Sequence, residues 1–218
     1  MTSEKKSLFK KIWYFIWEDN SIWSWIVNVI LAFLIIKFLV YPALGLGLGT
    51  SYPIVAVISS SMDHALANGE MCGKYPVNYQ SDLEDFWRVC GDWYEERDIT
   101  FEQFKEFPLK NGFKKGDLIV LKGRDPKDIN IGDIIVFQAS DPRVKPEPII
   151  HRIVKKTAID SEYIFQTKGD HNKDQIDDFI VKETYVSQDR LLGKGWFKIP
   201  YLGYVKILFV DFINMFRR

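Results

Sequence analysis

The chain has 218 residues, with 29 basic side chains, 29 acidic side chains and 47% apolar residues. This length allows one sizeable folded domain together with a membrane attachment. The balanced charge argues against a nucleic-acid-binding protein, because such proteins usually carry an excess of basic residues on one face.

Residues 1–20 combine lysines with aromatic side chains, which is typical of a basic tail leading into a membrane interface. Residues 21–42 are the predicted transmembrane helix, because Lys37 is the only charge between Ile22 and Val40. At about 1.5 Å per residue this stretch matches the ~30 Å hydrocarbon core of a bilayer. A cleaved signal peptide is the alternative, but its apolar region is usually only about 7–15 residues long. The lysines before the helix place the N-terminus in the cytoplasm and everything after Tyr41 outside, at the cell membrane.

A neck follows the predicted helix. Pro42 and the glycines of residues 45–49 are expected to break the helix and to give a flexible apolar connection. Such a neck would keep the next segment close to the bilayer.

Residues 55–62 read Val-Ala-Val-Ile-Ser-Ser-Ser-Met. The β-branched residues favour a short strand, the serines favour a turn at its end, and Met62 can anchor that turn in the core. Ser61 is a candidate nucleophile at this turn. The octapeptide by itself fits an ordinary serine-rich turn equally well, because serine hydroxyls often satisfy turn backbone.

Residues 63–112 change character and carry many acidic and aromatic residues, together with Cys72 and Cys90. Residues 83–94 and 100–107 are each predicted to form a short helix, the second with Thr100 as its N-cap and Gln103 completing a capping box. We expect an inserted cap. The two cysteines are predicted to form a disulfide worth about 3 kcal/mol, since they lie on the outward side. Two unpaired thiols are the alternative.

Residues 115–186 are rich in short β-branched runs separated by turns of Gly, Pro and Asp. The predicted strands are residues 118–121, 134–137, 149–154 and 163–167. Gly116-Asp117 and Gly132-Asp133 precede two of them, and their expected role is to form turns. The predicted fold class is mainly β, an antiparallel sheet or barrel-like domain, with an N-terminal transmembrane helix and a small helical insertion.

A serine hydroxyl attacks an amide only when a neighbouring base removes its proton, and a neutral imidazole does this well at physiological pH. The chain has three histidines, His64, His151 and His171. An imidazole base in turn works best beside a carboxylate. The acidic loop 169–178 offers four carboxylates at its positions 170, 174, 177 and 178. That loop lacks the spacing of a calcium loop, so we predict no metal site and no cofactor.

The order of these motifs resembles the archaeal and endoplasmic-reticulum type of signal peptidase I, a family of membrane-bound serine proteases. The motifs are the serine triplet before Met62, the Lys-Gly-Asp run from residue 115, the Gly-Asp run from residue 132, the His-Arg pair at residue 151 and the Gly-Asp-His-Asn box at residue 169. The resemblance extends from the membrane helix to about Gly195. The chain departs from the family pattern at His64, where the family has Pro, and at Ile176, where the family has its second Asp.

The resemblance implies that Ser61 is the nucleophile and His151 the general base. It implies that Asp170 completes the site, with Asp177 as the first guess for the carboxylate beside His151; Asp174 and Asp178 stay open for that role. Ser59 is expected to help bind the oxyanion, and Met62 to belong to the same oxyanion and substrate-binding group. The family further implies substrates with small residues at the first and third positions before the cleaved bond, bound as an extended strand.

Residues 199–218 are apolar on one face and are predicted to form an amphipathic helix on the membrane interface, or a second span. Residues 43–198 are then the extracytoplasmic protease domain. The predicted function is removal of signal peptides from secreted and membrane preproteins at the outer membrane surface. The expected partners are these preproteins, the bilayer and accessory subunits of unknown identity, with no nucleic acid. The alternative is a non-catalytic, membrane-anchored peptide-binding protein on the same β scaffold.

Overall fold

The computed structural model describes residues 2–160, 162–204, 208 and 215. It divides into two compact units, Met1–Gly47 and Leu48–Arg218, and each is described by itself. Most of the predicted C-terminal interfacial helix or second span, residues 199–218, lies outside the described residues and stays a prediction.

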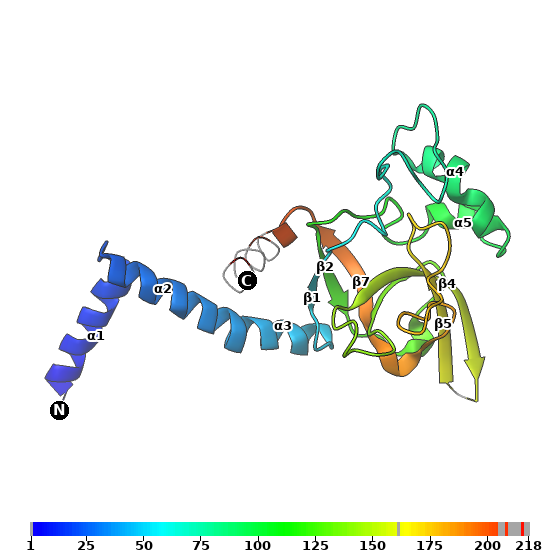
Figure 1. The fold of residues 1–218 in the computed structure, drawn as a ribbon. Helices are drawn as coiled ribbons and strands as arrows, with labels where there is room; N and C mark the ends of the chain where they lie inside the picture. Colours follow the sequence, from blue (N-terminus) through cyan, green and yellow to red (C-terminus); the bar gives the residue numbers. More distant parts are fainter. Residues whose placement is uncertain (1, 161, 205–207, 209–214, 216–218) are drawn as a thin grey trace. The chain divides into compact units, whose positions relative to one another are not determined.

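The first unit is helical (Figure 1). Helix α1 covers Thr2–Trp17, so the predicted basic tail is a helix, and α2 begins at Ile22 and ends at Ile35. Ser21 caps α2 by accepting a hydrogen bond from the Ser24 amide. The Ser24 hydroxyl and the Asn28 amide group donate to carbonyls of the last turn of α1, which fixes the corner between the helices.

The helix does not end at the predicted neck. A π-helical segment η1, Ile36–Val40, follows α2 and leads into α3, Tyr41–Leu48. The Tyr41 amide donates to the Ile36 carbonyl, and this wider turn directly precedes Pro42, which has no amide hydrogen to donate. The expectation of a flexible break at Pro42 is therefore wrong. Ile22–Leu48 forms one stretch of 27 residues, and among the described residues it is the one helix long and apolar enough to cross a membrane.

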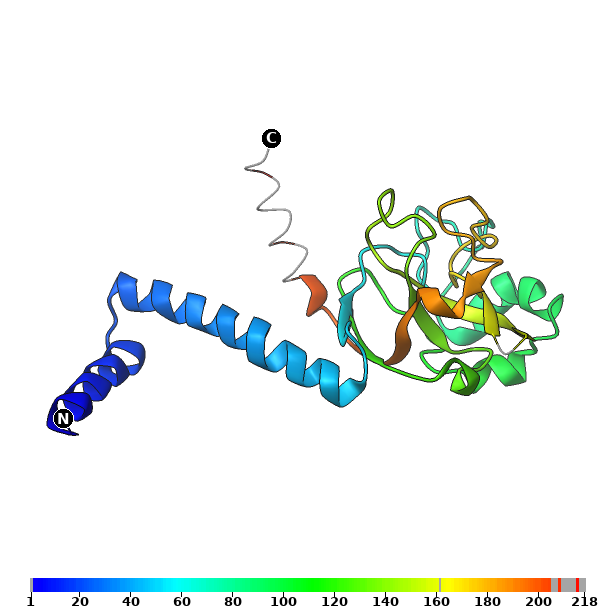
Figure 2. The same ribbon diagram turned by 90° about the horizontal axis from the view of Figure 1, so that it is seen from below.

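The second unit is built on a curled antiparallel sheet of seven strands in the order β1-β2-β7-β3-β4-β5-β6 (Figures 1 and 2). The strands are β1 Ile54–Ala56, β2 Leu118–Lys122, β3 Ile134–Phe137, β4 Ile149–Ile159, β5 Glu162–Lys168, β6 Val186–Ser187 and β7 Leu191–Ile199. Two short 3-10 helices, η2 Pro126–Asp128 and η3 Gln188–Arg190, join strands. The predicted fold class, mainly β with an N-terminal helix and a few further helices, is confirmed.

The four strands predicted between residues 115 and 186 are present, but β7 was not predicted although it lies in the middle of the sheet. Two glycines in β7, Gly193 and Gly195, weaken the strand pattern in the sequence. In the fold they permit close packing: a Cβ on Gly195 would lie 3.3 Å from the Ile134 side chain, and one on Gly193 would lie 3.3 Å from Leu121.

The Gly-Asp pairs shape turns, as expected. Gly116 and Gly132 have φ of 91° and 90°, a region that favours glycine. The side chains of Asp117 and Asp133 accept hydrogen bonds from the Lys114 and Asn130 amides. These turns set the starts of β2 and β3.

The insertion carries α4, Leu83–Glu95, and α5, Phe101–Lys105. The predicted capping box of Thr100 and Gln103 is present. Both helices pack against the β4 side of the sheet (Figure 2), through a cluster that includes Phe86, Tyr94, Phe104 and Val154. Cys72 and Cys90 form the predicted disulfide, with 5.7 Å between their Cα atoms.

Candidate active site

Ser61 lies in the turn that follows β1, and Met62 holds this turn in place. Met62 is fully buried among core side chains. Its carbonyl accepts from the Phe113 amide at 3.0 Å, and its sulfur lies 3.3 Å from the Asp170 amide nitrogen. Met62 thus anchors the turn, as its apolar character suggested, and it does not line the cavity beside Ser61.

A chain of three side chains runs from this turn into the sheet. The Ser61 Oγ lies 2.9 Å from Nε2 of His151, which stands on β4. The Nδ1 of the same ring lies 2.5 Å from Oε1 of Glu183. His151 and Glu183 are both buried, whereas Ser61 is half-buried at the surface of the unit.

The hydrogen bonds around Glu183 define how its carboxylate is held. Oε1 also accepts from the Thr167 hydroxyl at 3.0 Å, and Oε2 accepts from the Ile176 amide at 2.6 Å. An acceptor fixed in this way selects the His151 tautomer with its proton on Nδ1. Nε2 is then free to accept the proton of Ser61, which is the geometry of a nucleophile with its general base.

Asp170 does not contact His151 in this arrangement. Its two carboxylate oxygens receive Arg152 Nε at 2.9 Å and Arg152 NH2 at 2.7 Å. The Tyr94 hydroxyl donates at 3.1 Å, and His64 Nε2 lies 3.0 Å away. Both Asp170 and Arg152 are fully buried, so this is an internal ion pair next to the site.

The other three candidate carboxylates also have partners elsewhere. Asp177 accepts from the Thr184 hydroxyl, and Asp174 accepts from the indole of Trp93 at 2.9 Å. Asp178 accepts from backbone amides of its own turn. The structure therefore brings together Ser61 and His151 but places neither Asp177 nor its alternatives beside the imidazole.

Glu183 occupies that place, and sequence reasoning missed it. The predicted acid was sought within the acidic loop, at the spacing that the family pattern uses. The available signal was weak: Glu183 lies two residues after Val181, and the alternation puts both side chains on the buried side. Nothing in the sequence distinguished it from a solvated glutamate.

The buried charges perturb one another. Burial would raise the pKa of Asp170, but the Arg152 guanidinium and the hydrogen bond with His64 hold it well below its usual range. Burial lowers the pKa of His64, and its contact with Asp170 only partly offsets this. His64 is consequently neutral, and Asp170 is ionised, at physiological pH.

A cavity of about 230 Å³ opens beside Ser61. Ile58, Ile150 and His151 contribute to its wall, and Ser59 lies on its rim with Oγ 3.1 Å from the Ser61 Oγ. The pocket is narrow and mostly apolar, so it suits a small apolar group next to the nucleophile.

The third histidine, His171, has a backbone partner: its Nδ1 lies 3.1 Å from the Asp63 carbonyl. Within the described part of the chain, no group of three or more His, Cys, Asp or Glu side chains is placed to hold a metal ion.

Comparison with known proteins gives consistent relatives. No family model matches the chain. Proteins named "Signal peptidase complex catalytic subunit SEC11" are 31% identical over 106 residues in Colletotrichum graminicola, 30% over 105 residues in Scheffersomyces stipitis, and 31% over 125 residues in Schizosaccharomyces pombe. These matches cover 47–48% of this chain and 60–64% of the relatives. The chain thus spans about three fifths of their length, and its resemblance to signal peptidase I of the endoplasmic-reticulum type is confirmed.

Proposed function

We propose that the protein is a membrane-anchored serine endopeptidase that removes signal peptides from preproteins. The observation that carries this proposal is the hydrogen-bonded chain from Ser61 through His151 to Glu183. The similarity to signal peptidase catalytic subunits supports the substrate class.

In the proposed reaction the Ser61 oxygen attacks the carbonyl carbon of the scissile peptide bond, while its proton moves to Nε2 of His151. Glu183 stabilises the imidazolium that forms, without taking the proton itself. The imidazolium then gives this proton to the departing amine, which leaves an ester on Ser61. A water molecule, activated by the same imidazole, hydrolyses the ester and regenerates the serine.

The negative charge on the tetrahedral intermediate needs hydrogen-bond donors. The Ser61 amide and the Ser59 hydroxyl are the proposed donors, because both belong to the turn that carries the nucleophile. The contact between the Ser59 and Ser61 hydroxyls supports this assignment.

Substrate binding is proposed along β1, which is an edge strand with β2 as its partner. An extended peptide could add to this edge and place a small residue in the cavity beside Ser61. Keeping the rest of the signal peptide in the bilayer avoids exposing apolar groups to water, at about 0.8 kcal/mol per methylene.

The apolar helix Ile22–Leu48 is the proposed anchor, with the protease unit on the non-cytoplasmic side of the membrane. The Cys72–Cys90 disulfide supports this side, because disulfides persist in oxidising compartments. Accessory subunits are proposed from the word "complex" in the names of the relatives.

Cleavage of a membrane-inserted preprotein by the purified protein in detergent tests the proposal. Ser61→Ala and His151→Ala should each reduce the rate to the uncatalysed background. The matched control is Ser60→Ala, which removes a neighbouring exposed hydroxyl from the same turn. The control should cleave like the unmodified protein, after a small residue.

Two results would contradict the proposal. Full cleavage by Ser61→Ala would place the nucleophile elsewhere. A folded protein that binds the preprotein but does not cleave it, even with accessory subunits present, would favour the non-catalytic peptide-binding protein.

A further inference from the structure

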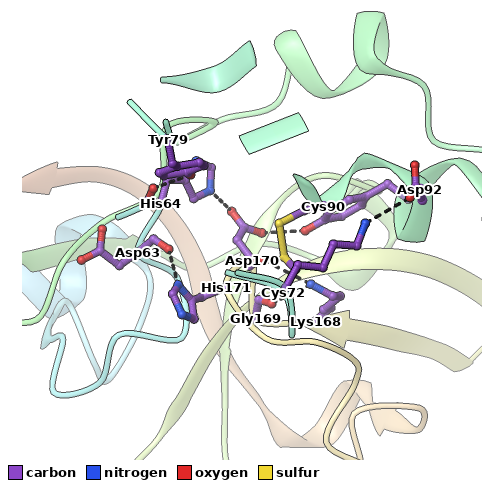
Figure 3. The surroundings of a disulfide bond; sticks show 12 residues. Asp63, His64, Cys72, Tyr79, Cys90, Asp92, Lys168, Gly169, Asp170 and His171 are labelled. Atoms are coloured by element: carbon purple, nitrogen blue, oxygen red, sulfur yellow. Dashed lines mark hydrogen bonds and ion pairs between the residues drawn. A yellow bond between two sulfur atoms is a disulfide. The ribbon is translucent and has the colours of Figure 1, made fainter. Parts of the chain in front are cut away.

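The insertion contacts the turn that carries Ser61 through a backbone relay. The Cys72 amide donates to the His171 carbonyl at 3.0 Å, and the His171 amide donates to the Ser61 carbonyl at 2.9 Å. Two successive hydrogen bonds therefore connect the disulfide-bonded segment of the insertion to the backbone of the candidate nucleophile. Figure 3 shows this region, with Cys72 beside Gly169, Asp170 and His171.

A second connection runs through side chains. Tyr94, on α4 of the insertion, donates to the Asp170 carboxylate, which also meets His64 near the end of the nucleophile turn. The His64 ring stacks on Phe86 of α4, with 3.8 Å between ring centroids. The same Asp170 holds Arg152, the neighbour of His151 on β4. Asp170 thus joins the insertion to both segments that carry the serine and the imidazole.

The disulfide joins these two connections covalently. Cys90 lies on α4, the helix that carries Tyr94 and Phe86, and it bonds to Cys72, the first residue of the backbone relay. Cys72 has a φ of 53°, a left-handed conformation that residues other than glycine rarely adopt. The bond to Cys90 and the hydrogen bond to His171 hold it there. Both sulfurs are buried, so the bridge is part of the packed structure.

We propose that the insertion positions the catalytic turn, with Cys72, Cys90 and Tyr94 as positioning residues, so that peptidase activity requires the oxidised insertion. This inference rests on the function proposed above. Without the bridge, the Cys72 segment is free to leave the His171 carbonyl, and the Ser61 turn loses part of its support. A displacement of about 1 Å at the nucleophile can cost about 100-fold in rate.

The test compares Cys72→Ala/Cys90→Ala with Lys74→Ala/Asp92→Ala. The second pair is a matched control, because the exposed ion pair of Lys74 and Asp92 joins the same two segments at 3.1 Å. We expect the cysteine variant to lose about 100-fold in kcat for preprotein cleavage at nearly unchanged KM, since the cavity beside Ser61 is lined by residues outside the insertion. The control should keep both constants.

A reversibility test uses the unmodified protein. Dithiothreitol, a dithiol, supplies two electrons and two protons, which convert the bridge to two thiols while the reagent closes to its own disulfide. We expect kcat to fall on reduction and to recover on reoxidation. The cysteine variant should respond to neither treatment.

Residue-resolved hydrogen exchange separates this inference from the proposed function, because it needs no substrate. The His171 amide should exchange at least 10-fold faster in the cysteine variant, while the amides of β3 keep their protection. Unchanged exchange at His171 together with unchanged kcat would overturn the inference. If no protein in the series cleaves a preprotein, the function proposal fails, and exchange at His171 still decides the positioning.

A cysteine variant whose β3 amides also lose protection has lost its fold, and Tyr94→Phe then decides. This variant keeps the aromatic ring and removes the hydroxyl that donates to Asp170. A kcat reduced about 10-fold at unchanged KM supports the inference, and unmodified kinetic constants overturn it.

Discussion

Two buried carboxylates lie close to His151, and their partners give them different roles. Asp170 meets a guanidinium, so its charge is already compensated and remains fixed. Glu183 meets a hydroxyl, a backbone amide and the imidazole, all of them uncharged when His151 is neutral. Glu183 is therefore the carboxylate that can respond when His151 gains a proton.

Glu183→Gln should lower kcat/KM for preprotein cleavage by about 10²–10⁴-fold, because an amide no longer stabilises the imidazolium or selects its tautomer. Asp177→Asn, at an exposed position that contacts Thr184, serves as the comparison. It should change kcat/KM by less than about 2-fold. A larger loss in Asp177→Asn than in Glu183→Gln would restore Asp177 as the acid.

His64 makes stability depend on pH. Its pKa is lowered in the folded protein, so below about pH 6.5 the unfolded chain binds more protons than the folded one. The free energy of unfolding should fall as the pH decreases through this range, by at most about 1.4 kcal/mol per pH unit. Denaturant unfolding between pH 7.5 and 5 measures this slope. His64→Gln, which keeps a donor for Asp170 but does not titrate, should flatten it; an equal slope in both proteins would contradict the assignment.

Among the elements, the loop after β5 brings the site together. Gly169 approaches three partners at once: a Cβ there would lie 2.7 Å from Asn172 Nδ2, 2.8 Å from the Ser61 carbonyl oxygen and 2.9 Å from Nε2 of His151. This glycine allows the loop to pass directly behind the serine and the imidazole. Its backbone φ is not the reason, because it lies outside the left-handed region; the reason is space.

Gly169→Ala should therefore separate Ser61 from His151 and lower kcat at least 10-fold. Thermal unfolding should shift much less, because the clash is confined to one edge of the unit. Gly73→Ala is a useful contrast, since a Cβ there meets mainly the flexible side chain of Lys173. Wild-type kcat in Gly169→Ala would show that the serine and the imidazole tolerate displacement.

At the scale of the whole molecule, the chain separates into a helical unit and a β unit, each with its own internal contacts. The three hydrophobic core clusters of buried residues all belong to the second unit. The apolar side chains of Ile22–Leu48 are largely exposed in the described structure, which is what a bilayer would cover.

Deleting residues 1–47 should leave the β unit folded, with its near-ultraviolet circular dichroism and its disulfide intact. Cleavage of a short soluble peptide should change by less than about 3-fold. Cleavage of a membrane-inserted preprotein should fall at least 10-fold, because enzyme and substrate no longer share a bilayer. Equal losses on both substrates would indicate that the first unit supports the fold of the second.

The sequence by itself determined the features that depend on local chemistry or on the order of motifs. Hydropathy defined the apolar helix, β-branched runs defined four strands, the Thr100 and Gln103 pair defined a helix start, and the motif order led to Ser61 and His151. The tertiary structure decided the rest. Glu183 and β7 depend on which distant segments meet in the sheet, and Asp170 received its partner from β4 rather than from its neighbours. Packing brings such groups together across long stretches of chain, and local patterns carry no record of those contacts.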